Sequence, residues 1–108
     1  MDLDDYQTQA GKTAIYNDAD AVLYPLFGLG SEVGELQDLY KKLLRDSNGL
    51  ITPQFRESMA LELGDVLWYV ANLAGDLGFE LEWVAQQNLD KLNSRMARGV
   101  IEGSGDYR

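Results

Sequence analysis

The chain has 108 residues without histidine or cysteine, and its 18 acidic and nine basic side chains give a formal net charge of −9. This acidity argues against binding to a nucleic-acid polymer, whose phosphates are bound mainly by clustered Lys and Arg, and the missing cysteines exclude disulfides and thiolate chemistry. No apolar run approaches the roughly 18 residues of a membrane span, and the acidic residues 1–5 are unlike a signal peptide. We therefore expect one cytoplasmic domain over residues 1–108, without a membrane partner.

The first two predicted helices occupy the N-terminal half. The first covers about residues 3–16, with Asp2, Asp4 and Asp5 near its start, where a helix dipole favours negative charge. Residues 17–20 (Asn-Asp-Ala-Asp) interrupt it. The second begins near Pro25, a favoured first-turn residue, and ends in the turn-forming residues 46–49 (Asp-Ser-Asn-Gly).

Two further helices are predicted in the C-terminal half. The third follows the N-cap Thr52 and Pro53 and runs to about Gly78. The fourth covers about residues 80–97, and residues 98–108 form a short irregular tail. Because short connections join long consecutive helices, and no strand pattern occurs, we predict an all-α fold, a four-helix antiparallel bundle.

Two carboxylate pairs lie on the apolar stripes of the second and third helices: Glu32 with Glu35, and Glu62 with Asp65. Residues three apart on a helix are neighbours, with Cβ atoms about 5–6 Å apart, so each pair can present two carboxylates together. Buried carboxylates take up protons, pair with cations or bind metal. Since the chain offers no His or Cys ligand, the expected metal is a hard, oxygen-bound ion, Mg²⁺ or else Mn²⁺.

The sequence around these pairs resembles a known family. Residues 28–35 (Gly-Leu-Gly-Ser-Glu-Val-Gly-Glu) and 62–69 (Glu-Leu-Gly-Asp-Val-Leu-Trp-Tyr) are similar to the signature of the MazG-like all-α nucleoside triphosphate pyrophosphohydrolases, in their single-domain, gene-cassette-type branch. The resemblance implies a MazG-like bundle that hydrolyses (deoxy)nucleoside triphosphates between the α and β phosphates, yielding a monophosphate and pyrophosphate. It also implies Mg²⁺ held by Glu32, Glu35, Glu62 and Asp65, and a role in sanitising the nucleotide pool.

Roles for individual residues follow from position. Glu35, together with Glu32, is the expected catalytic pair, with Glu35 orienting or deprotonating the attacking water. The expected phosphate-binding cations are Lys91, Arg95 and Arg108. Candidates for binding the nucleobase or sugar are Gln7, Trp68, Tyr69, Asn72 and Asn88.

Other roles for these residues stay open at this point. Lys91 and Arg95 can instead form salt bridges with a neighbouring helix, and Trp68 and Tyr69 can instead pack in the core or at a subunit interface. Asp76, three turns beyond Asp65, can ligate metal, pair with Lys91 or lie beyond the core where its helix ends.

Two other functions are compatible with this sequence, and the chain is also expected to self-associate. A non-enzymatic nucleotide- and metal-binding helical module, or a diphosphatase restricted to dUTP, would carry the same acids. A di-iron carboxylate bundle is disfavoured because its ligands include Glu-x-x-His. We expect self-association as a dimer or tetramer, since Leu61, Leu63 and Leu67 lie outside the metal-facing sector of their helix. The resemblance implies the same, with sites built across subunits.

Overall fold

The computed structural model describes all residues 1–108 and is entirely helical, which confirms the predicted all-α class. It contains four α-helices and one short 3₁₀-helix: α1 (Leu3–Gly11), η1 (Asp18–Asp20), α2 (Leu23–Ser47), α3 (Pro53–Asp76) and α4 (Leu81–Ala97). None of these helices combines the length and the apolar character needed to cross a lipid bilayer.

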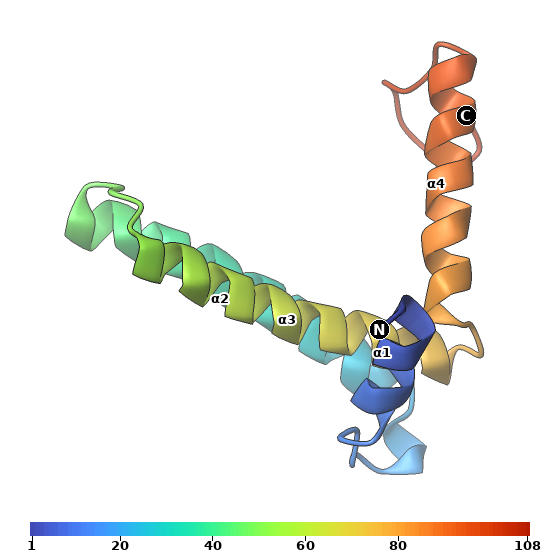
Figure 1. The fold of residues 1–108 in the computed structure, drawn as a ribbon, viewed down its shortest axis with the longest axis horizontal. Coiled ribbons are helices and arrows are strands. Elements are labelled where there is room, and N and C mark those ends of the chain that lie inside the picture. Colours follow the sequence, from blue (N-terminus) through green and yellow to red (C-terminus); the bar gives the residue numbers. More distant parts are fainter.

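Helices α2 and α3 lie side by side as a long antiparallel hairpin (Figure 1). α2 ends where Asn48 adopts a left-handed conformation, with φ 51°. α3 begins at the predicted N-cap, because the Thr52 hydroxyl accepts a hydrogen bond from the Phe55 N–H at 3.1 Å and Pro53 occupies the first turn. The short connection between the two helices brings their acidic residues to similar positions along the hairpin.

Helix α4 takes a different direction. Gly78, with φ 84°, ends α3 in a conformation that favours glycine. Figure 1 shows α4 then rising from the far end of the hairpin at a wide angle, so that it contacts α1 and α3 only near its own N-terminus. The antiparallel packing expected of a bundle is therefore present between α2 and α3, whereas most of the length of α4 has no neighbouring helix in the same chain.

The first helix is shorter than predicted. It starts with a reciprocal capping box between Asp2 and Asp5 but ends at Gly11, so the prediction of a helix to Tyr16 was wrong. Beyond Gly11 the chain bonds to α3 instead: Trp68 Nε1 donates to Thr13 Oγ1 at 2.8 Å, and the Tyr16 hydroxyl donates to Asp76 Oδ2 at 2.7 Å. These tertiary contacts replace the helical turn that the sequence pattern suggested.

The core lies where α1, α3 and α4 meet. Ala10, Ala71 and Leu81 are buried there, and the small side chains of Ala10 and Ala71 let α1 and α3 approach closely. Gln7 of α1 forms hydrogen bonds with α3, with the loop after it and with α4. Its Nε2 donates to the carbonyls of Ala71 (3.1 Å) and Phe79 (3.0 Å), and its Oε1 accepts a hydrogen bond from the Leu81 N–H (2.9 Å). Gln7 thus caps the first turn of α4 from α1.

The chain is unusually open for its size. Its accessible surface is 7862 Å², whereas a compact monomer of 12.1 kDa exposes about 6,000 Å². The Cα radius of gyration is 16.8 Å, against about 13 Å for a compact domain of this length. Only seven of the 108 residues are buried. A single copy therefore leaves much apolar surface in contact with solvent.

Candidate active site

Three glutamates converge on the α2–α3 hairpin. Glu32 and Glu35 stand one turn apart on α2, and Glu62 faces them from α3. One carboxylate oxygen from each lies within 4.8 Å of the others. Three acidic oxygens at this separation form a cluster that could hold a metal ion.

The burial of these carboxylates explains why they need a cation. Oε2 of Glu32 and Oε2 of Glu62 are buried without a hydrogen-bond partner, whereas the Glu35 residue is exposed. Burial, followed by the charges of Glu35 and Asp65 and contacts with Glu35 and Glu62, raises the pKa of the Glu32 carboxyl to about 7. Buried acceptors without donors are costly, so this oxygen-only donor set fits a hard divalent ion.

Asp65 lies beside this cluster. It lines a cavity of about 370 Å³ together with Glu32, Thr13, Trp68 and Tyr69, and its charge contributes to the raised pKa of Glu32. Glu32 and Asp65 therefore share one cavity, while Asp65 is not among the three acids that meet within 4.8 Å. Thr13 was not anticipated from the sequence, because it falls where a helix was predicted.

Asp76 is engaged away from the acidic cluster. Its Oδ2 accepts hydrogen bonds from the Tyr16 hydroxyl at 2.7 Å and from the Val22 N–H at 3.0 Å. Burial and this bond to Asp76 raise the pKa of Tyr16 well above its ordinary value, so the phenol stays a donor. The predicted pairing of Asp76 with Lys91 was wrong, because Lys91 pairs with Asp106 of the tail. Asp76 instead anchors the segment before α2 to the end of α3.

The predicted phosphate-binding cations Lys91 and Arg95 lie together on α4, where the tail folds back over them. Lys91 Nζ is 2.9 Å from Asp106 Oδ1. Arg95 is only 4% exposed, and its Nη2 donates to the carbonyls of Gly105 (3.2 Å) and Asp106 (3.0 Å), while its Nε has no partner. Lys91, and then Arg95, lower the pKa of Asp106 below its usual value. An aspartate thus already occupies an anion position on this cation pair.

Arg108, the third predicted phosphate contact, holds the tail in shape. Its guanidinium donates to the carbonyls of Val100 (3.2 Å), Ile101 (3.0 Å) and Gly105 (2.6 Å). Arg98 in turn donates to the carbonyl of Arg108 at 2.8 Å. The tail is therefore a folded loop on α4.

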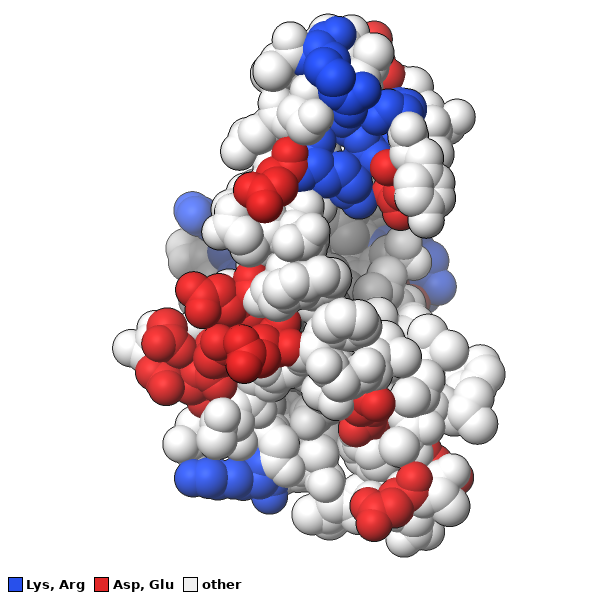
Figure 2. Space-filling model, turned by 90° about the vertical axis from the view of Figure 1, so that its right-hand side faces the viewer, with Lys and Arg blue, Asp and Glu red and all other residues white.

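The acidic cluster and the basic residues occupy separate parts of one chain. Figure 1 shows that α4 diverges from the hairpin carrying the glutamates. Figure 2 shows basic side chains gathered at the end of the molecule formed by α4 and the tail. Within a single copy, Lys91 and Arg95 are therefore not brought onto the acids that would hold the metal.

Only some of the residues predicted to bind the nucleobase line a cavity. Gln7 and Asn72 line none of the cavities, and their amide groups already bond within the chain: Gln7 as described above, and Asn72 Nδ2 to the Trp68 carbonyl at 3.0 Å. Trp68 and Tyr69 line the cavity of the acids, with their rings edge to face at 4.9 Å. Asn88 lies in another cavity, beside Lys91 on α4.

A pH-dependent stability follows from the raised pKa of Glu32. Between 4.5, the ordinary pKa, and about 7, the folded chain binds more protons at this site than the unfolded chain. Stability of the metal-free protein therefore falls as pH rises through this window. We expect Glu32→Gln to remove this decline and to raise the melting temperature at pH 8 in EDTA, measured by differential scanning fluorimetry.

The matched control is Glu57→Gln, an exposed acid on α3 outside the cluster, which should keep the wild-type profile. Parallel pH profiles of wild type and Glu32→Gln between pH 5 and 8 would contradict the raised pKa assigned to Glu32.

Comparisons with known proteins identify the family of the chain. The chain is 49% identical to the Gene 37 protein of Mycobacterium phage L5, with both chains covered over their full length. No solved structure matches it. A family model for the MazG nucleotide pyrophosphohydrolase domain matches residues 26–99, a region that includes α2 from Leu26 onward, all of α3 and α4, and both acidic pairs. The chain therefore belongs to the MazG nucleotide pyrophosphohydrolase family.

Proposed function

We propose that this protein hydrolyses (deoxy)nucleoside triphosphates to a nucleoside monophosphate and pyrophosphate, in an Mg²⁺-dependent reaction that removes unwanted nucleotides from the pool. The observation that carries the proposal is the convergence of Glu32, Glu35 and Glu62, with two buried carboxylate oxygens left without a partner. Membership of the family supports the reaction class.

The metal ligands in this proposal are Glu32, Glu35, Glu62 and Asp65. When bound there, Mg²⁺ would offset the carboxylate charge, polarise phosphoryl oxygens and make a water more acidic. Mn²⁺ has similar preferences for oxygen ligands and is the expected substitute. Neutralisation is necessary because a triphosphate, itself strongly anionic, would otherwise be repelled by four carboxylates.

The side chains then have separate roles in proton transfer, metal binding and phosphate binding. Glu35 is the exposed glutamate of the three, so it is the one positioned to accept a hydrogen bond from an attacking water and to take its proton. Glu32, whose pKa is raised by burial and then by the charges of its neighbours, stays with the metal. Lys91 and Arg95 bind phosphate oxygens once Asp106 is displaced from them.

A second copy of the chain completes the site in this proposal. The accessible surface exceeds that of a compact monomer by about 1,800 Å², more than the roughly 800 Å² that one partner buries in an ordinary interface. Exposed apolar side chains occur on α3 (Leu61, 68%) and on α4 (Leu89, 53%, and Met96, 66%). Packing α4 of one subunit against the hairpin of another would bury this surface and bring cations to the acids.

Sedimentation tests the assembly directly. At micromolar concentration we expect the 12.1 kDa chain to sediment as a dimer or tetramer, because burial of its exposed apolar surface favours association. Leu61→Glu should shift this equilibrium towards smaller species, since it places a charge on an exposed leucine of α3. The matched surface change is Arg56→Glu on the same helix. A wild-type chain that stays monomeric at every concentration would contradict the shared site.

The function itself is tested by pyrophosphate release from a panel of nucleoside triphosphates and diphosphates, including dUTP and dUDP, with and without Mg²⁺. We expect release from several triphosphates only when the ion is present. Cleavage of dUTP and dUDP alone would favour the restricted diphosphatase. Tight binding of nucleotide and metal without any cleavage would favour the non-enzymatic module and would overturn the proposal.

A further inference from the structure

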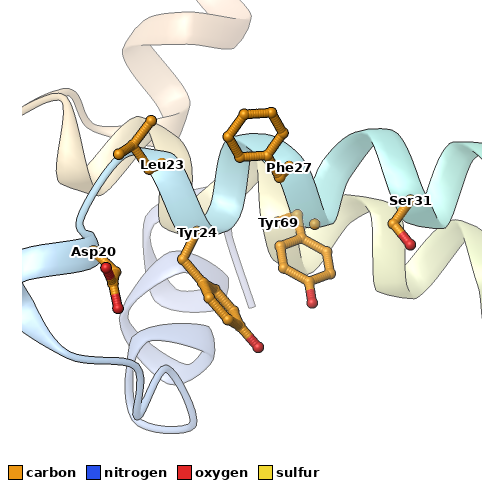
Figure 3. Close-up of a pocket in the computed structure, with 7 residues that line it drawn as sticks. Asp20, Leu23, Tyr24, Phe27, Ser31 and Tyr69 are labelled. Atoms are coloured by element: carbon orange, nitrogen blue, oxygen red, sulfur yellow. The ribbon is translucent and has the colours of Figure 1, made fainter.

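A second cavity, of about 540 Å³, opens beside the acids at the start of α2. Its walls are aromatic and aliphatic, and its polar groups are one carboxylate and three hydroxyls, a mixture typical of small-molecule sites. The lining residues are Asp20, Leu23, Tyr24, Phe27, Gly28, Ser31 and Tyr69. Figure 3 shows the oxygen ends of Asp20, Tyr24, Ser31 and Tyr69 pointing towards the same side of α2.

Tyr69 connects this cavity with that of the acids, because its side chain lines both. Its ring lies directly against Gly28 of α2, where a Cβ atom would overlap it. Ser31 lines the aromatic cavity and Glu32 lines the other, so consecutive residues of α2 serve the two cavities that share Tyr69. A ligand held at the acids could therefore extend past Tyr69 into the aromatic cavity.

The segment that carries Asp20 is held in a strained conformation. Val22 has φ 69°, which is rare for a β-branched residue, and its N–H donates to Asp76. Tyr16 donates to the same carboxylate oxygen, and its ring stacks on Tyr24 at 4.8 Å with an interplanar angle of 21°. Contacts on both sides of η1 thus hold the segment that carries Asp20 beside the cavity that Asp20 lines, and such strain is commonly retained at functional sites.

From this arrangement we infer that the aromatic cavity binds the nucleobase and that Asp20 selects bases presenting amino or adjacent N–H donors, guanine foremost. The inference rests on the proposed function, since the acids must hold the phosphates of the same nucleotide. It places base recognition at Asp20, Tyr24 and Phe27, none of which the sequence pattern had suggested for this role.

Asp20 discriminates because an ionised carboxylate only accepts hydrogen bonds. Guanine offers two neighbouring donors, N1–H and the 2-amino group, which one carboxylate can accept together. Cytosine and adenine each offer one amino group beside an acceptor. Thymine and uracil offer a single N–H between two carbonyl oxygens, which the carboxylate repels.

The test compares kcat/KM for pyrophosphate release from dGTP, dCTP, dATP, dTTP and dUTP. We expect dGTP to exceed dTTP by about 10- to 100-fold, the effect of one charged hydrogen-bonding pair. Asp20→Asn should remove most of this ratio. Asp18→Asn, on the same 3₁₀-helix but outside the cavity lining, should retain it.

Binding of the nonhydrolysable α,β-methylene analogues of dGTP and dTTP, measured by calorimetry, separates the inference from the function. Preference for the dGTP analogue that Asp20→Asn abolishes supports the inference, even in a protein that releases no pyrophosphate. Equal hydrolysis of all five triphosphates by wild type and Asp20→Asn overturns the inference and leaves the function standing. The inference also fails if Phe27→Ser changes the sedimenting species without changing the dGTP-to-dTTP ratio, because the cavity is then a subunit contact.

Discussion

Glu35→Gln is expected to lower kcat/KM for triphosphate hydrolysis by at least about 100-fold, because the loss of one carboxylate weakens the metal site and removes the expected base. The substitution keeps the size and the exposed position of the side chain, so the fold should persist. Steady-state pyrophosphate release at saturating Mg²⁺ measures the loss, and circular dichroism checks the helix content. Asp65→Asn should follow the same direction, since Asp65 shares a cavity with Glu32.

The control for these variants is Glu57→Gln, which removes one negative charge from an exposed position on α3. It separates loss of a specific ligand from a change in net charge. Full activity in Glu35→Gln and Asp65→Asn would place the metal elsewhere and would refute the site assigned to the hairpin.

Subunit mixing should restore activity to two inactive variants. Lys91→Met should lower kcat/KM about 10- to 100-fold, the effect of a charged hydrogen bond to phosphate, and Glu62→Gln should inactivate the acidic cluster. If the acids of one copy work with α4 of another, a hetero-dimer of these variants has one intact site and one doubly defective site. We expect such hetero-dimers, co-expressed with two affinity tags, to show about half of the wild-type rate.

The opposite geometry gives a different result. If each chain used its own Lys91, every site in the hetero-dimer would contain one of the two substitutions, and mixing would not restore activity. The homo-oligomers of each single variant, purified in the same way, set the background. A hetero-dimer no faster than these would show that α4 serves its own chain.

Much of the hairpin was predictable because local signals determine it. Thr52 and Pro53 start α3, Gly78 ends it, and the i,i+3 spacing places Glu32 beside Glu35 without any tertiary information. The absence of His and Cys likewise restricted the metal to oxygen ligands. These features depend on helix geometry and ligand chemistry, which short stretches of sequence specify.

The direction of α4 and the end of α1 could not be predicted from local sequence signals. The helical pattern continued past Gly11, but bonds from Trp68 to Thr13 and from Tyr16 to Asp76 pull the following residues onto α3. Partners more than fifty residues apart form these bonds, and helical periodicity carries no signal for them.

By itself, the sequence determined the number of long helices, the start of α3, the acidic pairs and the family, since each is encoded within a few turns of chain. Only the tertiary structure decided that Glu62 meets Glu32, that Asp106 covers Lys91, and that Asp20 faces an aromatic cavity beside the acids. The physical reason is that burial and charge contacts between distant residues depend on how helices pack, and packing is a property of the whole fold.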